Sequence, residues 1–411
     1  MYDAIVIGAR CGGAATAMLL ARKGHRVLLV DRAVFPSDIP HGHLIHRGGP
    51  WRLASWGLLG RAMASGCPAI TAMCVDQGDF PLAARDLVVD SVPVAFGPRR
   101  SALDHVLVEA AVEAGAELRE GFSVEALTTE GDRVTGIKGG DRRAGTSFTE
   151  RAAITIGADG RNSHVARAVG ATEYEQVPSL TCWYFSYWSD VPGDALELYD
   201  RHGRVIFAFP TNDNLFAVFV AWPIEELKTV RADIERQFLA AVDRVPALGE
   251  RVRGGRRADR FYGATDLRNF LRKPYGPGWA LVGDAGCHKD PYLALGVTDA
   301  FRDAELLANA IHDGLSGRRP MEGVLAEYEA ERNAATLPDY RMNLERARFT
   351  PMRPDERMLR AALHGNPAAT RQFFLTIEGL APRETFFAPE NIGRILSAAQ
   401  PPRRCRCARR S

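Results

Sequence analysis

The sequence predicts an α/β protein of two or three domains, on the basis of three observations. A strand, a glycine-rich turn, a helix and a second strand follow one another within residues 4–31. Aromatic and β-branched runs between residues 180 and 222 are typical of a separate antiparallel sheet. Beyond Pro320 the residues favour helices. A chain of 411 residues, 46% of them hydrophobic, can bury more than one core.

The opening unit predicts a dinucleotide-binding turn. An apolar strand over residues 4–7 runs into the turn GARCGG at residues 8–13, and a helix over 14–23 leads to a second strand over 26–30. Glycines let the backbone approach a pyrophosphate, and the helix start offers it free N–H groups. Arg10 stands where the middle glycine is usual, and its guanidinium could reach phosphate oxygens. We expect Cys11 to be a packing residue and Asp31 to accept hydrogen bonds from a ribose.

The elements that follow alternate between helix and sheet. A helix over residues 103–114 ends at Gly115, and a strand begins at 117. Segments 124–127, 134–138 and 152–156 predict a small β-excursion that returns to the parallel sheet. Runs at 183–188, 205–209 and 215–220 predict the strands of the second sheet. One helix over about 224–242, a strand over 279–282 and a helix over 297–311 complete the prediction.

Composition narrows the functional class. The formal charge is +2, from 52 basic and 50 acidic residues, so no strong field favours nucleic acid or an anionic membrane. No apolar stretch approaches membrane-spanning length, and the apolar start is unlike a secretory signal. Seven scattered cysteines predict reduced thiols in the cytoplasm. We expect no metal at Cys405 and Cys407, and expect their basic tail to be a solvated end or a tether to an acidic partner.

Two further signatures establish a family resemblance. They are GADG at residues 157–160 and GDA at 283–285, the latter followed by Pro291 and Gly296. Together with the first turn they make the chain resemble the class A, single-component FAD-dependent monooxygenases, the aromatic hydroxylases. Residues 100–107 also resemble that family's Arg-x-x-Leu-x-x-x-Leu pattern. The resemblance covers about residues 1–345.

The resemblance implies a glutathione-reductase-type FAD-binding domain with an inserted antiparallel β-sheet substrate domain and a helical C-terminal region. The FAD domain would comprise residues 1–70, 98–170 and 275–345. The substrate domain would comprise 71–97 and 171–274, and the helical region with its basic tail 346–411. We expect a monomer or homodimer.

The resemblance also assigns roles to single residues. Asp159 would serve both the flavin and the approach of NAD(P)H, Asp284 would hold the ribityl chain, and Arg100 would lie beside the ribityl-phosphate region. A helix starting at Gly296 would point at the pyrimidine edge of the flavin. The full set of expected cofactor-binding residues is Gly8, Arg10, Cys11, Gly13, Asp31, Arg32, Arg100, Val124, Asp159, Gly283, Asp284, Pro291, Gly296 and Val297.

The late signature departs from the family pattern. After residue 285 the family has Ala-His, then Pro, then Gly-Gln-Gly and an Asn. This chain has Gly286 and Cys287, then Ala-Leu-Gly at 294–296 and Thr298. We therefore do not carry over to this chain the polar contacts that Gln and Asn make near the ring in the family.

The implied reaction is oxygenation. NAD(P)H would reduce FAD, O2 would add to the reduced flavin, and the resulting hydroperoxide would transfer one oxygen atom to a small aromatic or polyketide-like substrate. A single dinucleotide-type turn leaves no dedicated NAD(P)H domain, so NAD(P)H would be a transient co-substrate.

An apolar substrate would lie between the flavin and the aromatic sheet. Candidate contacts are His46, Tyr184, Phe207, Phe209 and Trp222, with Trp183 and Tyr187 as further wall residues. Only about half of each strand can point inward, so ordinary core packing competes with this role. The loop over residues 41–49, with three histidines and Arg47, would bind NAD(P)H phosphate or substrate carboxylate, or pack structurally. His202 is a candidate base or a turn residue, and no catalytic residue is assigned.

Three alternatives stay open. A flavin-dependent prenyl or polyene reductase of geranylgeranyl-reductase type is one, because FAFP at residues 207–210 resembles part of that family's motif, although its tryptophan is missing. A flavin-dependent halogenase shares the expected fold, but its Trp-x-Trp-x-Ile-Pro motif is not found. A flavoprotein that carries a ligand without turnover is the third.

Overall fold

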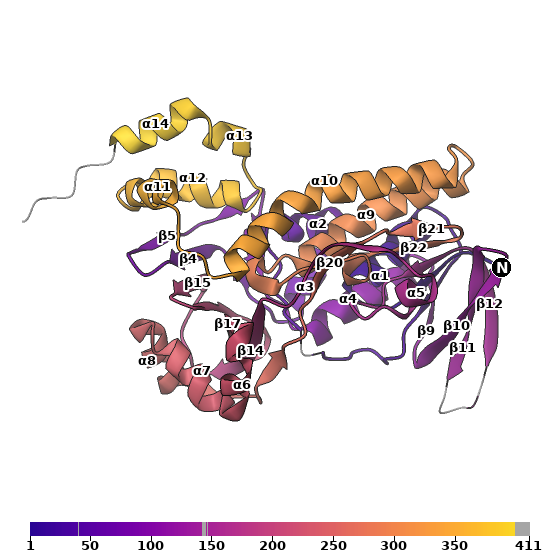
Figure 1. Cartoon of the computed structure of the whole chain (residues 1–411), viewed down its shortest axis with the longest axis horizontal. Helices are drawn as coiled ribbons and strands as arrows, with labels where there is room; N and C mark the ends of the chain where they lie inside the picture. Colours follow the sequence, from indigo (N-terminus) through magenta and orange to yellow (C-terminus); the bar gives the residue numbers. More distant parts are fainter. Residues whose placement is uncertain (40, 142–144, 146, 399–411) are drawn as a thin grey trace, which may run out of the picture.

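A five-stranded parallel sheet forms the centre of the first domain (Figure 1). The structure is a computed structural model, and it describes residues 1–39, 41–141, 145 and 147–398. Every neighbouring pair in this sheet is parallel, and the strands in spatial order are β22 (Trp279–Leu281), β12 (Phe148–Gly157), β1 (Tyr2–Ile7), β2 (Val27–Val30) and β9 (Glu117–Arg119). These strands are mostly buried on both faces, which explains their continuous apolar runs.

Layers cover both faces of this sheet. One face packs against α1 (Cys11–Arg22), α4 (Arg100–Glu113) and α9 (Gly296–Leu315). The small side chains of α1 let it lie close to both the sheet and α9. The other face packs against a meander of β10 (Phe122–Glu130) and β11 (Arg133–Asp141), together with α5 (His164–Ala168). β12 belongs to both units, because residues 148–151 pair with β11 and 152–157 with β1.

A second sheet lies beside the first domain. All its neighbours are antiparallel except β15 and β4, which are parallel. Its strands in order are β18 (Arg256–Arg257), β14 (Thr181–Ser189), β17 (Phe216–Pro223), β16 (Arg204–Pro210), β15 (Ala195–Arg201), β4 (Ala72–Asp76) and β5 (Pro81–Ala84), with β19 (Tyr262–Ala264) also on β14. Two of its strands therefore come from the segment before α4.

Alternation along the strands divides the aromatic residues between two faces. The outer face, with Tyr184 and Trp222, packs against Phe238 on a group of helices. These helices are α6 (Leu227–Ala232), α7 (Ile234–Val242) and α8 (Pro246–Gly254). The inner face, with Phe207 and Phe209, packs toward the loops of the first domain and the C-terminal helices. The sheet thus separates the two sets of aromatic side chains.

The helix predicted over residues 224–242 is interrupted. The structure has a 3-10 turn at Ile224–Glu226, then α6, then α7, with a break at Asp233. Asp233 is extended (φ −157°), and its carboxylate accepts a hydrogen bond of 3.1 Å from the N–H of Arg236. An aspartate in this position starts a new helix by satisfying a free N–H group.

Short elements connect the two sheets. A three-stranded sheet joins β13 (Glu173–Val177), β20 (Asn269–Arg272) and β23 (Cys287–His288). The remaining short elements are α2 (Gly49–Ser55), α3 (Leu59–Ala64), β3 (Ala69–Ile70), β6 (Val88–Val89), β7 (Val92–Pro93), β8 (Ala95–Phe96), β21 (Tyr275–Gly276), η1 (Asn212–Asn214), η3 (Gly283–Ala285) and η4 (Pro291–Leu293).

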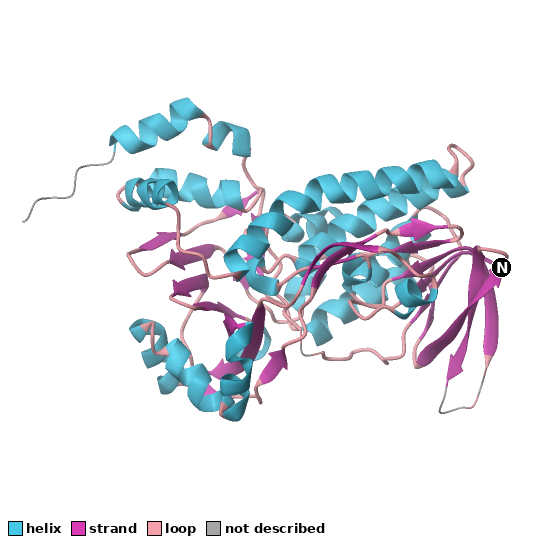
Figure 2. Ribbon diagram, viewed as in Figure 1, coloured by secondary structure: helices cyan, strands magenta, loops and turns pink. Residues whose placement is uncertain are grey.

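The C-terminal part is helical (Figure 2). The long α10 (Met321–Ala347) lies along α9, and a group of four helices follows near β4 and β5. These four are α11 (Pro354–His364), α12 (Pro367–Ile377), α13 (Arg383–Phe386) and α14 (Pro389–Ala398). The predicted α/β fold with a helical C-terminal region is confirmed. No helix among the described residues is long and apolar enough to cross a membrane. The basic tail with Cys405 and Cys407 lies outside the described residues.

Trp222 tests the assignment of the outer face. Its side chain is fully buried, so Trp222→Ala should lower the free energy of unfolding by about 3–5 kcal/mol, in the range for large aromatic truncations. Urea denaturation measures this. Phe148→Ala, at a ring that is 47% exposed, should change stability by less than about 0.5 kcal/mol. Equal effects at the two positions would contradict the assignment.

Candidate active site

The turn between β1 and α1 requires its glycines. Gly8 has φ +103°, and a β-carbon there would lie 2.4 Å from the carbonyl oxygen of Ala158. A β-carbon on Gly13 would lie 1.7 Å from the carbonyl oxygen of Gly8. α1 begins without a side-chain cap and without an acidic residue in its first turn. Its first N–H groups and its positive dipole end therefore suit a phosphate.

Asp31 closes this turn from the end of β2. Its carboxylate accepts hydrogen bonds from the N–H groups of Ala9 (2.7 Å) and Ala33 (2.8 Å). A carboxylate has about four acceptor positions, so two remain for ribose hydroxyls. Arg32 is exposed next to it, and Val124 is half-buried on β10.

Arg10 is held by an aspartate that the sequence analysis did not single out. Arg10 Nη1 lies 2.7 Å from Asp104 Oδ2, and its guanidinium also lies 5.4 Å from the ring centre of Phe35. Arg100 binds the same carboxylate at 2.9 and 3.0 Å. Asp104 is fully buried, so two arginines compensate one carboxylate and leave a net positive charge beside the turn. Its signal in the sequence was the i, i+4 spacing from Arg100 on one helix.

Cys11 packs within the same cluster. Its Sγ lies 3.4 Å from Asp104 Oδ1, and burial raises the pKa of the thiol to about 12. The protonated thiol is therefore the stable form, and a redox role has no support in this geometry.

The late motif adjoins the turn. A β-carbon on Gly12 would lie 3.7 Å from the Cα atom of Gly283, which has φ +62°. Asp284 is half-buried in η3, and its carboxylate makes no hydrogen bond with the described residues. Its acceptors are free for ribityl hydroxyls, which is the fit that FAD requires here.

His41 brings further charges to this place. Crowding by protein atoms, together with the charges of Arg100 and Arg161, lowers the pKa of its imidazole to about 4, and Asp284 opposes the shift. His41 is consequently neutral at pH 7, and the positive charge facing the turn comes from the arginines.

Asp159 caps a helix. Its carboxylate accepts hydrogen bonds from the Ser163 hydroxyl (2.5 Å) and the His164 N–H (2.6 Å), which lie at the start of α5. Its first role in the structure is therefore to hold the turn after β12. The expected contacts to flavin and NAD(P)H remain a proposal.

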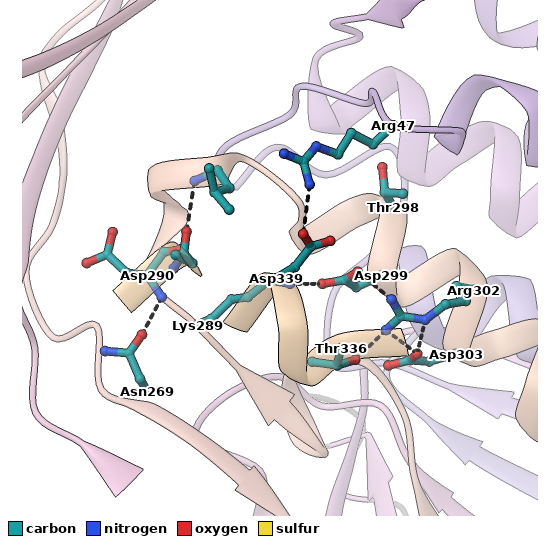
Figure 3. Close-up of polar contacts among 12 residues, drawn as sticks. Arg47, Asn269, Lys289, Asp290, Thr298, Asp299, Arg302, Asp303, Thr336 and Asp339 are labelled. Carbon is teal, nitrogen blue, oxygen red and sulfur yellow. Dashed lines mark hydrogen bonds and ion pairs between the residues drawn. The ribbon is translucent and has the colours of Figure 1, made fainter. Parts of the chain in front are cut away.

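The loop before α9 is tied to the second sheet through Asp290. The buried Asp290 carboxylate accepts hydrogen bonds from the Thr181 hydroxyl (2.6 Å) and the Tyr292 N–H (3.1 Å). The Asp290 N–H donates to the side-chain oxygen of Asn269 (2.6 Å) (Figure 3). Burial raises the pKa of Asp290 to about 6, against the hydrogen bonds that lower it. Pro291 starts η4 directly after this anchor.

A charge network holds α9 behind that loop. Lys289 pairs with Asp299, and Arg302 contacts Asp299 (2.8 Å) and Asp303 (2.7 Å) (Figure 3). Gly296 is exposed at the helix start, Val297 is buried, and no side chain caps the first turn. The N-terminal dipole of α9 is therefore available to a negatively charged ring edge.

The loop over residues 41–49 joins the two domains. His43 is fully buried, with Nδ1 3.0 Å from the Gly97 carbonyl oxygen and Nε2 3.1 Å from the Tyr187 hydroxyl. Because Nδ1–H must donate to a carbonyl, Nε2 accepts from Tyr187. Burial lowers the pKa of His43 to about 4. His46 differs, since Glu378 and the Leu293 carbonyl occupy its two nitrogens.

The expected substrate residues separate into three places. Phe207 and Phe209 lie on the inner face, with His43 against Phe209 at a ring distance of 5.4 Å. Tyr184 and Trp222 lie on the outer face under α7, so the sheet stands between them and the first domain. His46 lies in the domain-joining loop with no free ring nitrogen.

His202 is exposed in the turn between β15 and β16. Among the described residues no group of three or more metal-ligand side chains is found.

At the carboxyl ends of β1, β12 and β22 the structure brings together groups whose chemistry suits FAD, and a family comparison supports FAD as the cofactor. A family model described as an FAD binding domain matches residues 1–337. The chain therefore belongs to this FAD-binding family, and it is an FAD-dependent oxidoreductase of the monooxygenase and halogenase type.

Individual relatives differ in activity. Digeranylgeranylglycerophospholipid reductase of Methanocella arvoryzae is 26% identical over 80% of this chain and 82% of the relative. Kynurenine 3-monooxygenase of Salinispora arenicola is 25% identical over 89% and 83%. The solved structure of the myxobacterial chondrochloren halogenase CndH superposes with a TM-score of 0.76, covers 98% of both chains and is 22% identical. The last likeness concerns the fold.

Asp284 tests the cofactor assignment. Asp284→Ala removes acceptors from the ribityl chain and should raise the FAD dissociation constant about 10-fold or more, on the scale of one or two hydrogen bonds. Titration of the apoprotein with FAD, followed by flavin fluorescence, measures it. Asp313→Ala, at the far end of α9, is the control and should bind FAD as the wild type does.

His43 should make the protein sensitive to acid. Its pKa is about 4 when folded and about 6.5 when unfolded, so the unfolded state binds more protons between these values and stability falls as pH falls. From pH 7 to 5 the loss should be roughly 2 kcal/mol. His43→Gln should flatten this slope in urea denaturation, whatever its own stability. An unchanged slope would show that His43 does not titrate in this way.

Proposed function

We propose that the protein is a monooxygenase that uses NAD(P)H and O2 to oxygenate a small aromatic or polyketide-like substrate. The carrying observation is the aromatic inner face of the second sheet, which lies against the loops of the FAD domain. Phe219 stacks on Phe185 (ring distance 4.5 Å) and on Phe209 (5.6 Å). Such a wall favours a planar apolar molecule and excludes water from its vicinity.

One neutral polar pair interrupts this wall. Tyr187 donates to His43, and the guanidinium of Arg99 lies 4.6 Å from the Tyr187 ring centre. Burial raises the pKa of Tyr187, so its hydroxyl stays protonated. In the proposal the Tyr187 oxygen accepts a hydrogen bond from a substrate hydroxyl and thereby orients the ring. His43 Nε2 accepts the hydrogen bond of the Tyr187 hydroxyl. The Gly97 carbonyl accepts from His43 Nδ1–H and so fixes the tautomer of the imidazole.

FAD, when bound, supplies the electron transfer and the activation of O2. The chain's own contribution is to bind the pyrophosphate at the start of α1, to hold the ribityl chain at Asp284, and to exclude water from the aromatic inner face of the second sheet. The described residues contain one dinucleotide-type turn, so NAD(P)H would approach transiently. The arginines around His41 would attract its phosphates.

A reductase is the second candidate, and a specific observation favours it. In the segment 207–210 Phe207 and Phe209 lie on the inner face of the sheet, and Ala208 lies on the outer face. The motif therefore presents two neighbouring aromatic rings to the inner side. The archaeal reductase relatives support the same alternative. A polyene chain could pack against these two rings as well as an aromatic substrate could.

Oxidation of NAD(P)H separates the candidates. With FAD-loaded protein and a panel of phenols, aryl amines and aromatic polyketides, we expect a substrate that stimulates NADH or NADPH oxidation at least 10-fold, with one O2 consumed per product. Tyr187→Phe keeps the ring and should lower product formation while flavin reduction persists. Anaerobic reduction of a double bond would instead establish the reductase. A bound flavin that NAD(P)H never reduces would establish a carrier.

A further inference from the structure

The C-terminal helices meet the loop over residues 41–49 at one buried carboxylate. Glu378 follows α12 directly and is 2% exposed. Its Oε2 atom accepts hydrogen bonds from His46 Nδ1 (3.0 Å) and from the N–H of Arg47 (2.9 Å). The two segments are 332 residues apart in the sequence.

Without His46 and Arg47 the charged form of the Glu378 carboxylate would be unfavourable at this position. The C-terminal end of a helix has a partial negative charge, and burial alone would raise the pKa of a carboxyl group. The pKa of Glu378 is nevertheless below its usual range, because His46 and Arg47 outweigh burial. The loop over residues 41–49 thus supplies the groups that compensate the carboxylate at the end of α12.

The other side of His46 contacts the loop before α9. His46 Nε2 lies 2.9 Å from the Leu293 carbonyl oxygen, and the Thr298 hydroxyl donates to the His46 carbonyl at 2.6 Å. Both ring nitrogens therefore lie against acceptor oxygens, one of the Glu378 carboxylate and one of the Leu293 carbonyl. The charged groups facing this place are Glu378 and the ion pair of Arg47 with Asp339 (2.9 Å), shown in part in Figure 3.

We propose that His46 and Glu378 are a positioning pair, through which the docked C-terminal helices set the geometry of the flavin-facing loop over residues 291–298. The pair orients the Leu293 carbonyl and the start of α9, and removal of either side chain's hydrogen bonds releases both the loop and α12. This inference rests on FAD binding and on the assignment of residues 291–298 to the flavin, and it does not depend on oxygenation of a substrate.

The test compares two glutamates of the same helical region. Glu378→Gln removes the buried charge, and Glu356→Gln removes the 2.8 Å ion pair between α11 and Arg346 of α10 without touching the loop over residues 41–49. Amide hydrogen exchange and FAD affinity are measured on the full-length apoprotein. Visible circular dichroism is measured on the FAD-loaded protein. Glu378→Gln should speed exchange in both 291–298 and 367–377, change the flavin dichroism and weaken FAD about 10-fold. Glu356→Gln should leave residues 291–298 and the flavin spectrum unchanged.

Two variants guard against simple unfolding. Glu378→Asp keeps the charge at a shorter reach and should give an intermediate dichroism change in a folded protein. His46→Gln combined with Glu378→Gln should add little to either single change, because the two residues act as one unit. Wild-type exchange in 291–298 for Glu378→Gln, or the same response from Glu356→Gln, would overturn the proposal. These readouts need no turnover, so a failed oxygenation assay leaves them valid.

Discussion

Three strands of the parallel sheet, β1, β12 and β22, end close together, and this closeness determines where the candidate site can form. β1, β12 and β22 end at Ile7, Gly157 and Leu281. A side chain at Gly8 would collide with the backbone of Ala158, and one at Gly157 with Val165. Only this closeness brings the helix dipole of α1, the carboxylate of Asp284 and the arginine cluster to one edge of the sheet. In the proposed site, a dinucleotide bound along that edge would extend toward the junction with the second sheet.

At that junction several buried polar groups are paired across the boundary between the two sheets. His43 with Tyr187 and Asp290 with Thr181 are each buried and hydrogen-bonded across the domain boundary. Buried polar groups in an aromatic environment specify one arrangement because any slippage leaves a donor or acceptor unpaired. The two domains are therefore held in register by hydrogen bonds, while the aromatic rings supply the apolar surface.

Local patterns in the sequence were sufficient for part of this picture. The βαβ opening, the glycines of the turn and the fold family follow from residues close together in the chain, and the family is confirmed. The facing of Tyr184 and Trp222 did not follow, because alternation fixes only that neighbours point apart, and the helices that cover one face come later. Glu378 was missed because its partner His46 lies 332 residues away, where no spacing rule applies. Asp104 pairs with Arg100 at i, i+4 spacing, but its second partner, Arg10, lies 94 residues away, so its place beside the turn did not follow.

The parallel pairing of β4 with β15 also bears on how the chain is made. Ala72 pairs with Ala195, so 123 further residues must be synthesised after Ala72 before β4 can pair with β15. At typical translation rates of about 5–20 residues per second this is roughly 6–25 s. During that time the nascent β4–β5 hairpin has an open edge, which is prone to pairing with other chains. A fragment ending before residue 195 would expose this edge permanently, so heterologous expression is expected to favour the uninterrupted chain and chaperone-rich hosts.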